Sequence, residues 1–476
     1  MTTTSPAPPV VTAPAPGPSL SGAGLLTVLL GAALPLIDFF IVNVALPTID
    51  HDLHASEPVL ELVVAGYGIA YAVLLVLGGR IGDAVGRRRL FIGGMAAFGL
   101  TSLACGLAPS AGTLVAARIA QGAASAAMLP QVLATIQATT TGQRRAKAMS
   151  LYGATAGLSM VAGQVLGGVL VSADLFGTGW RSVFLVNVPV AVVALILAVR
   201  TVPETRSARP EPLDGPGTVL LTLALLSLLV PLTEGQASGW PLWTWLSLAA
   251  FPLLAYLFYA VEARADRAGR TPLIPPSLLR LTSLRRGLVM MVPFSIGFSG
   301  FMFVIAVALQ QGERVAATTA GLALAPMAGA FFVTSLLGPR LVARWGTRVV
   351  TAGGLLQGLG IGLIALAAWR TWPDLGIVQL LPGAVVAGIG QALQLPVLFR
   401  IILSEVPATR AGVGGGVMTT TQQASLALGV ATLGTLFLSL APHVGMRDAL
   451  VTTLVVQLVA IAVTVALSLR LPRRIA

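Results

Sequence analysis

Two charged residues lie inside apolar runs that are long enough to cross a membrane. Asp38 lies in LPLIDFFIVNVALP (34–47), and Arg118 lies in LVAARIAQGAASAAMLP (114–130). A charged side chain at that depth costs about 2.5 to 3.5 kcal/mol on the insertion scale, so each must face a cavity or a partner. A carboxyl group can take up and release a proton, whereas arginine stays charged and needs a counter-ion. We therefore predict that Asp38 can carry a proton reversibly and that Arg118 has a counter-ion, an aqueous cavity or carbonyl groups beside it, with Gln121 near Arg118 on the same helix face.

Glycine and arginine are concentrated in LGGRIGDAVGRRRLF (77–91), between two apolar runs. Closely spaced glycines let two helices pack in contact, and arginines gathered on one side of a membrane fix the orientation of the chain. We expect a cytoplasmic hairpin in which Asp83 and the arginines after it close this side by reversible charge pairing. The residues predicted to form this gate are Gly79, Gly82, Asp83, Gly86, Arg87 and Arg88.

The composition is that of a membrane protein. Of the 476 residues, 56% are hydrophobic and 10% are charged, and the mean hydropathy is +0.89. Soluble domains carry about 25% charged residues. The net charge of +12 does not indicate a nucleic-acid partner, because the arginines lie in short loops rather than on one basic face. In those loops they face anionic lipid.

Other chemistries lack the residues that they need. Cys105 is the only cysteine, so an intrachain disulfide is impossible, and His51, His54 and His443 do not form a compact set of metal ligands. The GxxxxGK[ST] phosphate loop of ATP-driven pumps is absent from the sequence. We expect no metal and no cofactor.

Fourteen apolar runs reach the length of a membrane-spanning helix, about 20 residues. They lie at 23–47, 59–79, 89–108, 112–137, 147–171, 182–200, 215–233, 241–261, 287–311, 318–341, 348–369, 376–402, 413–440 and 447–471. The loops assigned to the outer side hold only Arg181, Arg314, Arg370 and Arg447, whereas the other loops are rich in arginine. Because cytoplasmic loops carry the excess of basic residues, we predict a multi-pass inner-membrane protein with both termini in the cytoplasm.

The polar stretch from Ala263 to Arg286 separates two groups of spans. GPRLVARWGTRVV (338–350) repeats the glycine and arginine layout of 77–91, as expected of a transporter built from two related halves. We predict an all-α polytopic protein with two six-helix bundles and two additional central helices. Its parts are a disordered cytoplasmic tail (1–22), a first bundle (23–200), a linker with the two additional spans (201–286) and a second bundle (287–476).

Five motifs follow one another along the chain. They comprise Asp38, Asn43, Ala45, Leu46 and Pro47; the six gate residues; Arg118, Gln121 and Gly122; GLSMVAGQVLGG (157–168); and Trp180, Arg181, Phe184, Asn187 and Pro189. Together they resemble the fourteen-helix drug:proton antiporter family of the major facilitator superfamily. The resemblance implies that protons are the coupling ion and that Asp38 and Arg118 take part in this coupling. It also implies that Gly157, Gly163, Gly167 and Gly168 pack a fifth helix closely against a helix of the second half. Gln164 stands where the family places a proline.

The resemblance also implies a central site for lipophilic, often cationic compounds. A cation site calls for a carboxylate and aromatic rings, and Glu61 is the best placed of the acids near the outer helix ends for coupling. The residues expected to line the substrate site are Asn43, Phe40, Gln121, Glu313, Gln310, Gln311, Phe298, Gln422 and Gln423.

We predict from these features a proton-coupled antiporter that exports drugs or antibiotics by alternating access, and not an enzyme. Its expected partners are a small drug-like molecule, protons and membrane lipid, and it is expected to be a monomer. The alternative is a dedicated proton-coupled transporter of one metabolite, peptide or lipid, working in export or uptake. A membrane-embedded transferase is a remote alternative, because the acids are isolated and no loop is long enough to hold a catalytic site.

Overall fold

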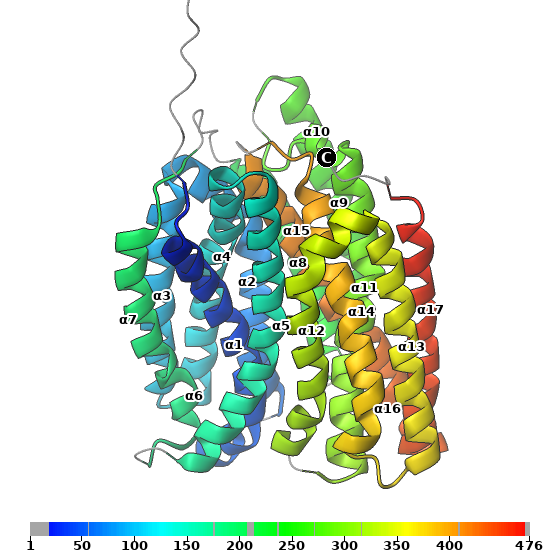
Figure 1. Ribbon diagram of the computed structural model, residues 1–476. Coiled ribbons are helices and arrows are strands. Elements are labelled where there is room, and N and C mark those ends of the chain that lie inside the picture. The colour runs from blue at the N-terminus through cyan, green and yellow to red at the C-terminus, as the bar shows by residue number, and fades with distance from the viewer. Residues whose placement is uncertain are drawn as a thin grey trace, which may run out of the picture.

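The structure is a computed structural model, and it describes residues 19–55, 57–174, 177–206, 214–235, 238–270, 272–315, 317–407 and 410–471. Long helices run side by side across the whole molecule (Figure 1). Within the described residues, thirteen helical segments are long and apolar enough to cross a membrane. α5 (Gly142–Ala173) covers the remaining predicted span at 147–171. The fourteen predicted spans therefore all lie on helical segments, with 182–200 and 413–440 each divided between two helices, and the all-α prediction is confirmed.

The remaining helices fall into three groups along the chain. The first half contains α1 (Gly22–Leu53), α2 (Glu57–Val85), α3 (Arg87–Gly106), α4 (Ala111–Thr139), α6 (Ser182–Leu185) and α7 (Asn187–Thr201), besides α5. The middle of the chain forms α8 (Gly215–Glu234), α9 (Leu242–Arg267) and the short α10 (Pro276–Leu279). The second half contains α11 (Thr282–Val307), α12 (Ala317–Trp345), α13 (Arg348–Thr371), α14 (Ile377–Leu403), α15 (Ala411–Gly429), α16 (Thr435–Val444) and α17 (Met446–Ser468). Of the predicted tail, residues 1–18 lie outside the described residues.

Polar side chains fix where several helices begin. The Ser21 hydroxyl accepts a hydrogen bond from the Gly24 amide at 3.0 Å, at the start of α1. Asp214 does the same for α8, accepting from the Gly217 amide at 2.9 Å. Such caps satisfy amide groups that have no partner within the first turn of a helix. They fix the first residue of each of these two helices, which the apolar composition alone does not define.

The two halves use glycine at corresponding places. A Cβ atom on Gly122 of α4 would lie 2.3 Å from the backbone oxygen of Tyr67 in α2. In the second half, a Cβ atom on Gly388 of α14 would lie 2.1 Å from the backbone oxygen of Met327 in α12. In each half, glycine thus lets the fourth-position helix touch the backbone of the second. This agrees with the internal repeat that the two arginine-rich loops indicate.

The halves are joined at one end of the molecule and separate at the other. We call the end where α1 begins and α17 ends the terminal end (Figure 1). Near it, one buried hydrophobic cluster combines Leu133 and Met149 of the first half with Phe399 and Ile402 of the second. At the opposite end each half has its own cluster, and Phe40 of α1 is the first-half residue packed against the cluster of the second. The structure is therefore closed at the terminal end.

The central hairpin of α8 and α9 is anchored near the terminal end. α8 packs against both α2 and α15, whereas α9 packs mainly against α8. The segment that follows α9 is held from three helices. Arg80 of α2 donates to the Pro272 carbonyl, and Asp214, at the start of α8, accepts from the Leu273 amide at 3.3 Å. Glu262 of α9 accepts from the Ile274 amide at 2.6 Å. The hairpin is thus fixed to the contact between the two halves.

Candidate functional site

A buried group of polar side chains surrounds Asp38 in the middle of α1. The carboxylate forms an ion pair with Arg118 of α4. It also accepts hydrogen bonds from Gln121 Nε2 at 3.0 Å and from Asn187 Nδ2 at 2.7 Å. All four side chains are buried, and those of Asp38 and Arg118 are 0% exposed. The negative charge is therefore matched by one positive charge and two neutral donors, as a charge inside a membrane requires.

Arg118 makes contacts that exceed a simple ion pair. Its Nη1 also donates to Gln121 Oε1 at 2.7 Å, and its Nε donates to the Val63 carbonyl at 3.0 Å. The guanidinium carbon lies 4.2 Å from the ring centre of Tyr67, which is a cation–π distance. Nη2 is buried without a hydrogen-bond partner among the residues that the structure describes. The arginine is thus held in place by α1, α2 and its own helix.

A second layer of hydrogen bonds fixes the donors. Ser102 Oγ of α3 accepts from Gln121 at 3.2 Å and from Asn187 at 3.1 Å, and donates to the Phe184 carbonyl at 2.9 Å. Tyr67 donates to the Pro35 carbonyl at 3.0 Å. Six helices, α1 to α4, α6 and α7, therefore contribute to one network, and a change in the charge of the carboxylate reaches all of them.

Sequence reasoning found only part of this network. It singled out Asp38, Arg118 and Gln121, and the structure brings these three together. It did not assign Asn187 and Ser102 to the carboxylate, since their contact depends on how α3 and α7 pack beside α1. Asn187 had a usable signal, because it is a polar residue within the apolar run that follows the WRSVF motif.

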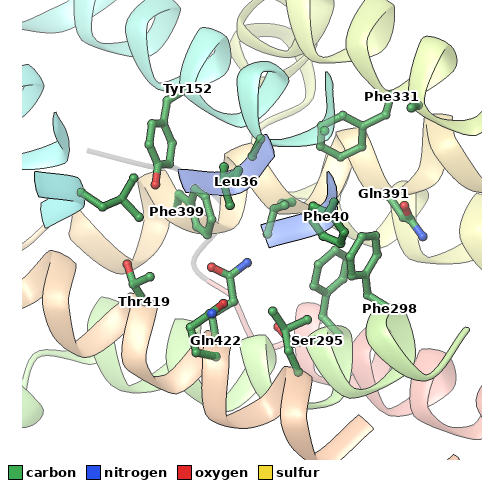
Figure 2. Close-up of a pocket in the computed structure, with 18 of the residues that line it drawn as sticks. Leu36, Phe40, Tyr152, Ser295, Phe298, Phe331, Gln391, Phe399, Thr419 and Gln422 are labelled. Carbon is green, nitrogen blue, oxygen red and sulfur yellow. The ribbon is translucent and has the colours of Figure 1, made fainter. Parts of the chain in front are cut away.

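A cavity lies between the halves, on the far side of α1 from Asp38. It is lined from both halves, and Leu36 and Phe40 of α1 are part of its wall. Residues two apart on a helix point to nearly opposite sides, so Asp38 faces away from the cavity that its neighbours line. The aromatic lining includes Tyr71, Tyr152, Phe294, Phe298, Phe331 and Phe399, and the polar lining comprises Ser295, Gln391, Thr419, Gln422 and Gln423. Figure 2 shows these side chains converging from several helices.

The predicted substrate residues divide between the cavity and other places. Phe40, Phe298, Gln422 and Gln423 line the cavity, whereas Gln121 lies in the polar network instead. Gln310, Gln311 and Glu313 do not line it, because they lie at the end of α11, where a π-helical turn at Ala308–Gly312 ends the span. The backbones of Asn43, Glu61 and Gln164 lie in helices, but their side chains lie outside the described residues.

The predicted gate residues form a compact corner at the terminal end. Arg87 Nη2 lies 2.7 Å from Asp83 Oδ1, and both side chains are buried. Between them, Gly86 adopts a φ of 119°, which is open to glycine and strained for other residues. The Arg87 amide donates to the Thr205 carbonyl at 2.8 Å, and Arg88 donates to the Val199 carbonyl. These contacts fasten the α2–α3 corner to the end of α7.

Gly79 and Gly82 lie in the last turns of α2, and both are buried. A Cβ atom on Gly82 would lie 1.9 Å from Gln131 Oε1 of α4. A side chain at this position would displace the Gln131 amide group, which donates to the Gly78 carbonyl at 2.9 Å. The close backbone contact between α2 and α4 lies at Gly78, where a Cβ atom would be 2.2 Å from the Ala126 carbonyl oxygen.

The glycines of the fifth helix serve two different contacts. A Cβ atom on Gly157 would lie 2.3 Å from Cδ1 of Phe331 in α12, so this glycine faces the second half as the resemblance implies. A Cβ atom on Gly163 would instead lie 2.7 Å from the Ile37 carbonyl oxygen of α1. The expectation for Gly163 is corrected, because Gly163 lies on the side of α5 that faces α1 of the same half. Gly167 and Gly168 are buried further along α5.

Two residues of the WRSVF motif bind the opposite end of α1. Trp180 Nε1 donates to Asp52 Oδ2 at 2.8 Å, and Arg181 Nη1 donates to the same oxygen at 2.6 Å. The hydrogen bond from Arg181, and next that from Trp180, lowers the pKa of the exposed Asp52 carboxyl below its ordinary value. The longer motif of Trp180, Arg181, Phe184, Asn187 and Pro189 therefore holds both the end and the middle of α1, since Asn187 donates to Asp38.

Comparison with known proteins places this architecture. The family model of the Major Facilitator Superfamily matches residues 28–430. The human organic anion transporter MFSD10 (TETRAN) has a similar crystal structure, with a TM-score of 0.65 and 16% sequence identity over 93% of this chain and 99% of that chain. At that identity, the likeness shows a shared fold.

Two relatives are similar over most of their length. The chain is 37% identical over 436 residues to the "Probable actinorhodin transporter" of Streptomyces coelicolor, which covers 89% of this chain and 75% of that protein. It is 32% identical over 422 residues to the "Tetracenomycin C resistance and export protein" of Streptomyces glaucescens, which covers 87% of this chain and 76% of that protein.

Proposed function

Because this chain belongs to the Major Facilitator Superfamily, we propose that it exports small drug-like molecules from the cytoplasm in exchange for protons. It is a multi-pass membrane protein and a transporter rather than an enzyme. The names of its relatives, which include a transporter and a resistance and export protein, support export. The observation that carries the proposal is the buried pair of Asp38 and Arg118 behind the α1 wall of a cavity between the halves.

The proposed orientation places the terminal end in the cytoplasm of a cell with the protein in its inner membrane. The arginine-rich loops lie at this end, as the distribution of basic residues in membrane proteins favours. In this orientation the hydrophobic cluster of Leu133, Met149, Phe399 and Ile402 closes the cytoplasmic side. The state described is then one of the two that alternating access needs.

The proposed coupling runs through α1. Protonation of Asp38 removes the charge that balances Arg118, and it weakens the hydrogen bonds from Gln121 and Asn187. α1 is then free to shift against α4 and α7, and the shift moves Leu36 and Phe40 in the cavity wall. Substrate arriving from the cytoplasm favours the opposite position of α1 and expels the proton. Inward proton flow, worth about 2.3 kcal/mol per charge per 100 mV, drives the cycle.

Proteoliposomes with an acidic interior test the coupling. In wild-type vesicles, protons that leave the acidic interior should drive a planar aromatic probe inward, so that the probe accumulates inside. Asp38→Asn should abolish gradient-driven accumulation and retain exchange of labelled for unlabelled probe, because binding survives when the proton site is lost. Asp50→Asn is the matched control, since Asp50 is an exposed acid on the same helix. Gradient-driven accumulation by Asp38→Asn at the wild-type level would refute the proposal.

A further inference from the structure

The cavity between the halves has walls of two kinds. In Figure 2, aromatic side chains lie on two sides, Thr419, Gln422 and Ser295 lie along a third, and Gln391 lies apart from these three beside Phe298. On the aromatic sides, the rings of Tyr152 and Phe399 are 5.8 Å apart between centres, and those of Phe294 and Phe298 are stacked at 6.5 Å with 8° between their planes. Thr419 and Gln422, one turn apart on α15, belong to the polar side. Flat rings stack on such walls, so the shape suits a flat aromatic ligand with polar atoms on one edge.

Two polar side chains of the lining are buried without a partner. Gln391 and Ser295 are each 1% exposed. Gln391 Nε2 and Ser295 Oγ have no hydrogen-bond partner among the residues that the structure describes. A buried donor without a partner is unfavourable, and it becomes favourable when a ligand supplies an acceptor. The amide nitrogen can only donate, so the missing partner is an acceptor atom such as a carbonyl oxygen.

The lining offers no carboxylate to a positive charge. Among the residues that the structure describes, no charged side chain lines the cavity. The carboxylate of Asp38 lies behind α1 and is already paired with Arg118. A cation that entered the cavity would lose its water and find aromatic faces but no counter-ion, which is unfavourable for a charge.

We infer that this cavity selects flat, uncharged aromatic molecules with hydrogen-bond-accepting oxygens, and that it discriminates against aromatic cations. The inference rests on the proposed function, because it takes this cavity as the substrate site. It replaces the expectation of cationic substrates, which required an acid such as Glu313 beside the aromatic rings. Gln391 and Ser295 are the residues assigned to the ligand oxygens.

Three probes of nearly the same shape test this selectivity. N-methylacridone is neutral with a carbonyl oxygen, N-methylacridinium is a permanent cation without that oxygen, and anthracene is neutral without oxygen. Binding to the purified full chain in lipid nanodiscs is measured by the fluorescence of each probe. N-methylacridone should bind at least roughly tenfold more tightly than the other two, as expected for a hydrogen bond in a site that excludes water. Equal or tighter binding of the cation would overturn the inference and leave export itself standing. Failure of the wild type to bind any probe would count against both proposals.

Substitutions at one position separate the two parts of the inference. Gln391→Leu should weaken N-methylacridone binding roughly tenfold and leave anthracene binding unchanged, because only the oxygen contact is lost. Gln391→Glu should reverse the preference and favour N-methylacridinium, because it supplies the missing counter-ion. Gln422→Leu, at a half-buried position of the polar wall, provides a second test if the Gln391 variants do not fold. Unchanged N-methylacridone binding in both leucine variants would refute the assignment of polar side chains of the lining to the ligand oxygen.

Discussion

At the scale of single residues, the geometry around Arg118 depends on the shape of the guanidinium group as well as its charge. One nitrogen contacts both Asp38 and Gln121, a second donates to the Val63 carbonyl, and the planar group lies over the Tyr67 ring. Lysine has one nitrogen on a flexible chain, and it cannot reach these partners together. The site therefore needs arginine at this position.

The substitution Arg118→Lys tests this requirement. We expect at least a roughly tenfold loss of gradient-driven uptake although the positive charge is kept, because a hydrogen bond to a charged group contributes about 1.5 to 3 kcal/mol. Initial rates in proteoliposomes provide the measurement, with Arg314→Lys as the control at an exposed position. Wild-type rates in Arg118→Lys would show that charge alone suffices.

Asp52 gives a second residue-scale prediction, concerning pH. Its carboxyl has a lower pKa in the folded protein than in the unfolded chain, because Arg181 and Trp180 donate to it. The stabilisation is therefore present above the unfolded pKa of about 4 and is lost as the pH falls through the lower folded value. We expect Asp52→Asn to lower the melting temperature slightly at pH 7, and we expect this difference to shrink progressively as the pH falls below about 4. A difference that persists undiminished at lower pH would show that the contact does not depend on the charge.

The residues of the site could be predicted where their type is unusual for their surroundings. Asp38 and Arg118 are conspicuous because a charge in an apolar run demands an explanation. Ser102 and Tyr67 carry no such signal, since a hydroxyl group is common in membrane helices and can bond to its own backbone. Gln391 was not singled out from the sequence either, and only the folded structure shows that its Nε2 is buried without a hydrogen-bond partner among the described residues.

At the scale of helices, the close contact of α5 with the second half depends on glycine residues, which have no side chain. Gly157 lies against Phe331, and Gly153 of the same helix lies against Pro396 of α14. These two glycines bring α5 close to the second half at the level of the cavity. A larger side chain would separate the halves there, since well-packed contacts tolerate added volume poorly.

Gly157→Leu is expected to destabilise the protein by about 1 to 3 kcal/mol and to reduce transport, because it forces Phe331 out of its position. Gly329→Leu is the matched control, since a Cβ atom on this glycine of α12 meets nothing within 4 Å. Thermal unfolding and uptake are compared for both variants. Equal effects of the two substitutions would show that close packing at Gly157 is not required.

Helix boundaries follow from the sequence more readily than helix partners do. The predicted spans lie on the observed helices because membrane-spanning helices must be long and apolar. α1 nevertheless extends to Leu53, beyond the predicted end at 47, because its last turns leave the apolar run and are held by the Asp52 contacts. Similarly, α11 begins at Thr282, inside the predicted linker. Polar helix ends of this kind are fixed by tertiary contacts that hydropathy does not record.

At the scale of the whole molecule, the joint cluster at the terminal end holds the two halves together. Gln137 of α4 donates to the Leu403 carbonyl of α14 at 3.4 Å across this contact. Alternating access requires that the contact open in another state of the cycle, because a substrate could not otherwise enter from the cytoplasm. A covalent link across it should therefore stop transport.

Cysteines at Gln137 and Ser404 test this expectation. Ser404 is the exposed neighbour of Leu403, and the single native cysteine, Cys105, is buried, so background labelling is low. A short bifunctional thiol reagent should link the pair and abolish uptake, and reductive cleavage of the link should restore it. Each single-cysteine variant treated in the same way serves as the control. Full transport by the linked protein would exclude opening at this end.

The position of α8 makes the two long contacts between the halves unequal. Leu225 and Leu229 of α8 pack against Ala72 and Val73 of α2, and α8 also contacts α15. The α2–α15 contact therefore lies behind a further helix pair, whereas α5 and α12 meet without such a cover in the described part of the chain. In a bilayer, lipid tails would therefore meet the α5–α12 flank directly, whereas α8 and α9 would separate them from the α2–α15 flank. A compound that dissolves in the bilayer before it binds would thus meet the α5–α12 contact directly, whereas α8 and α9 would lie between it and the α2–α15 contact.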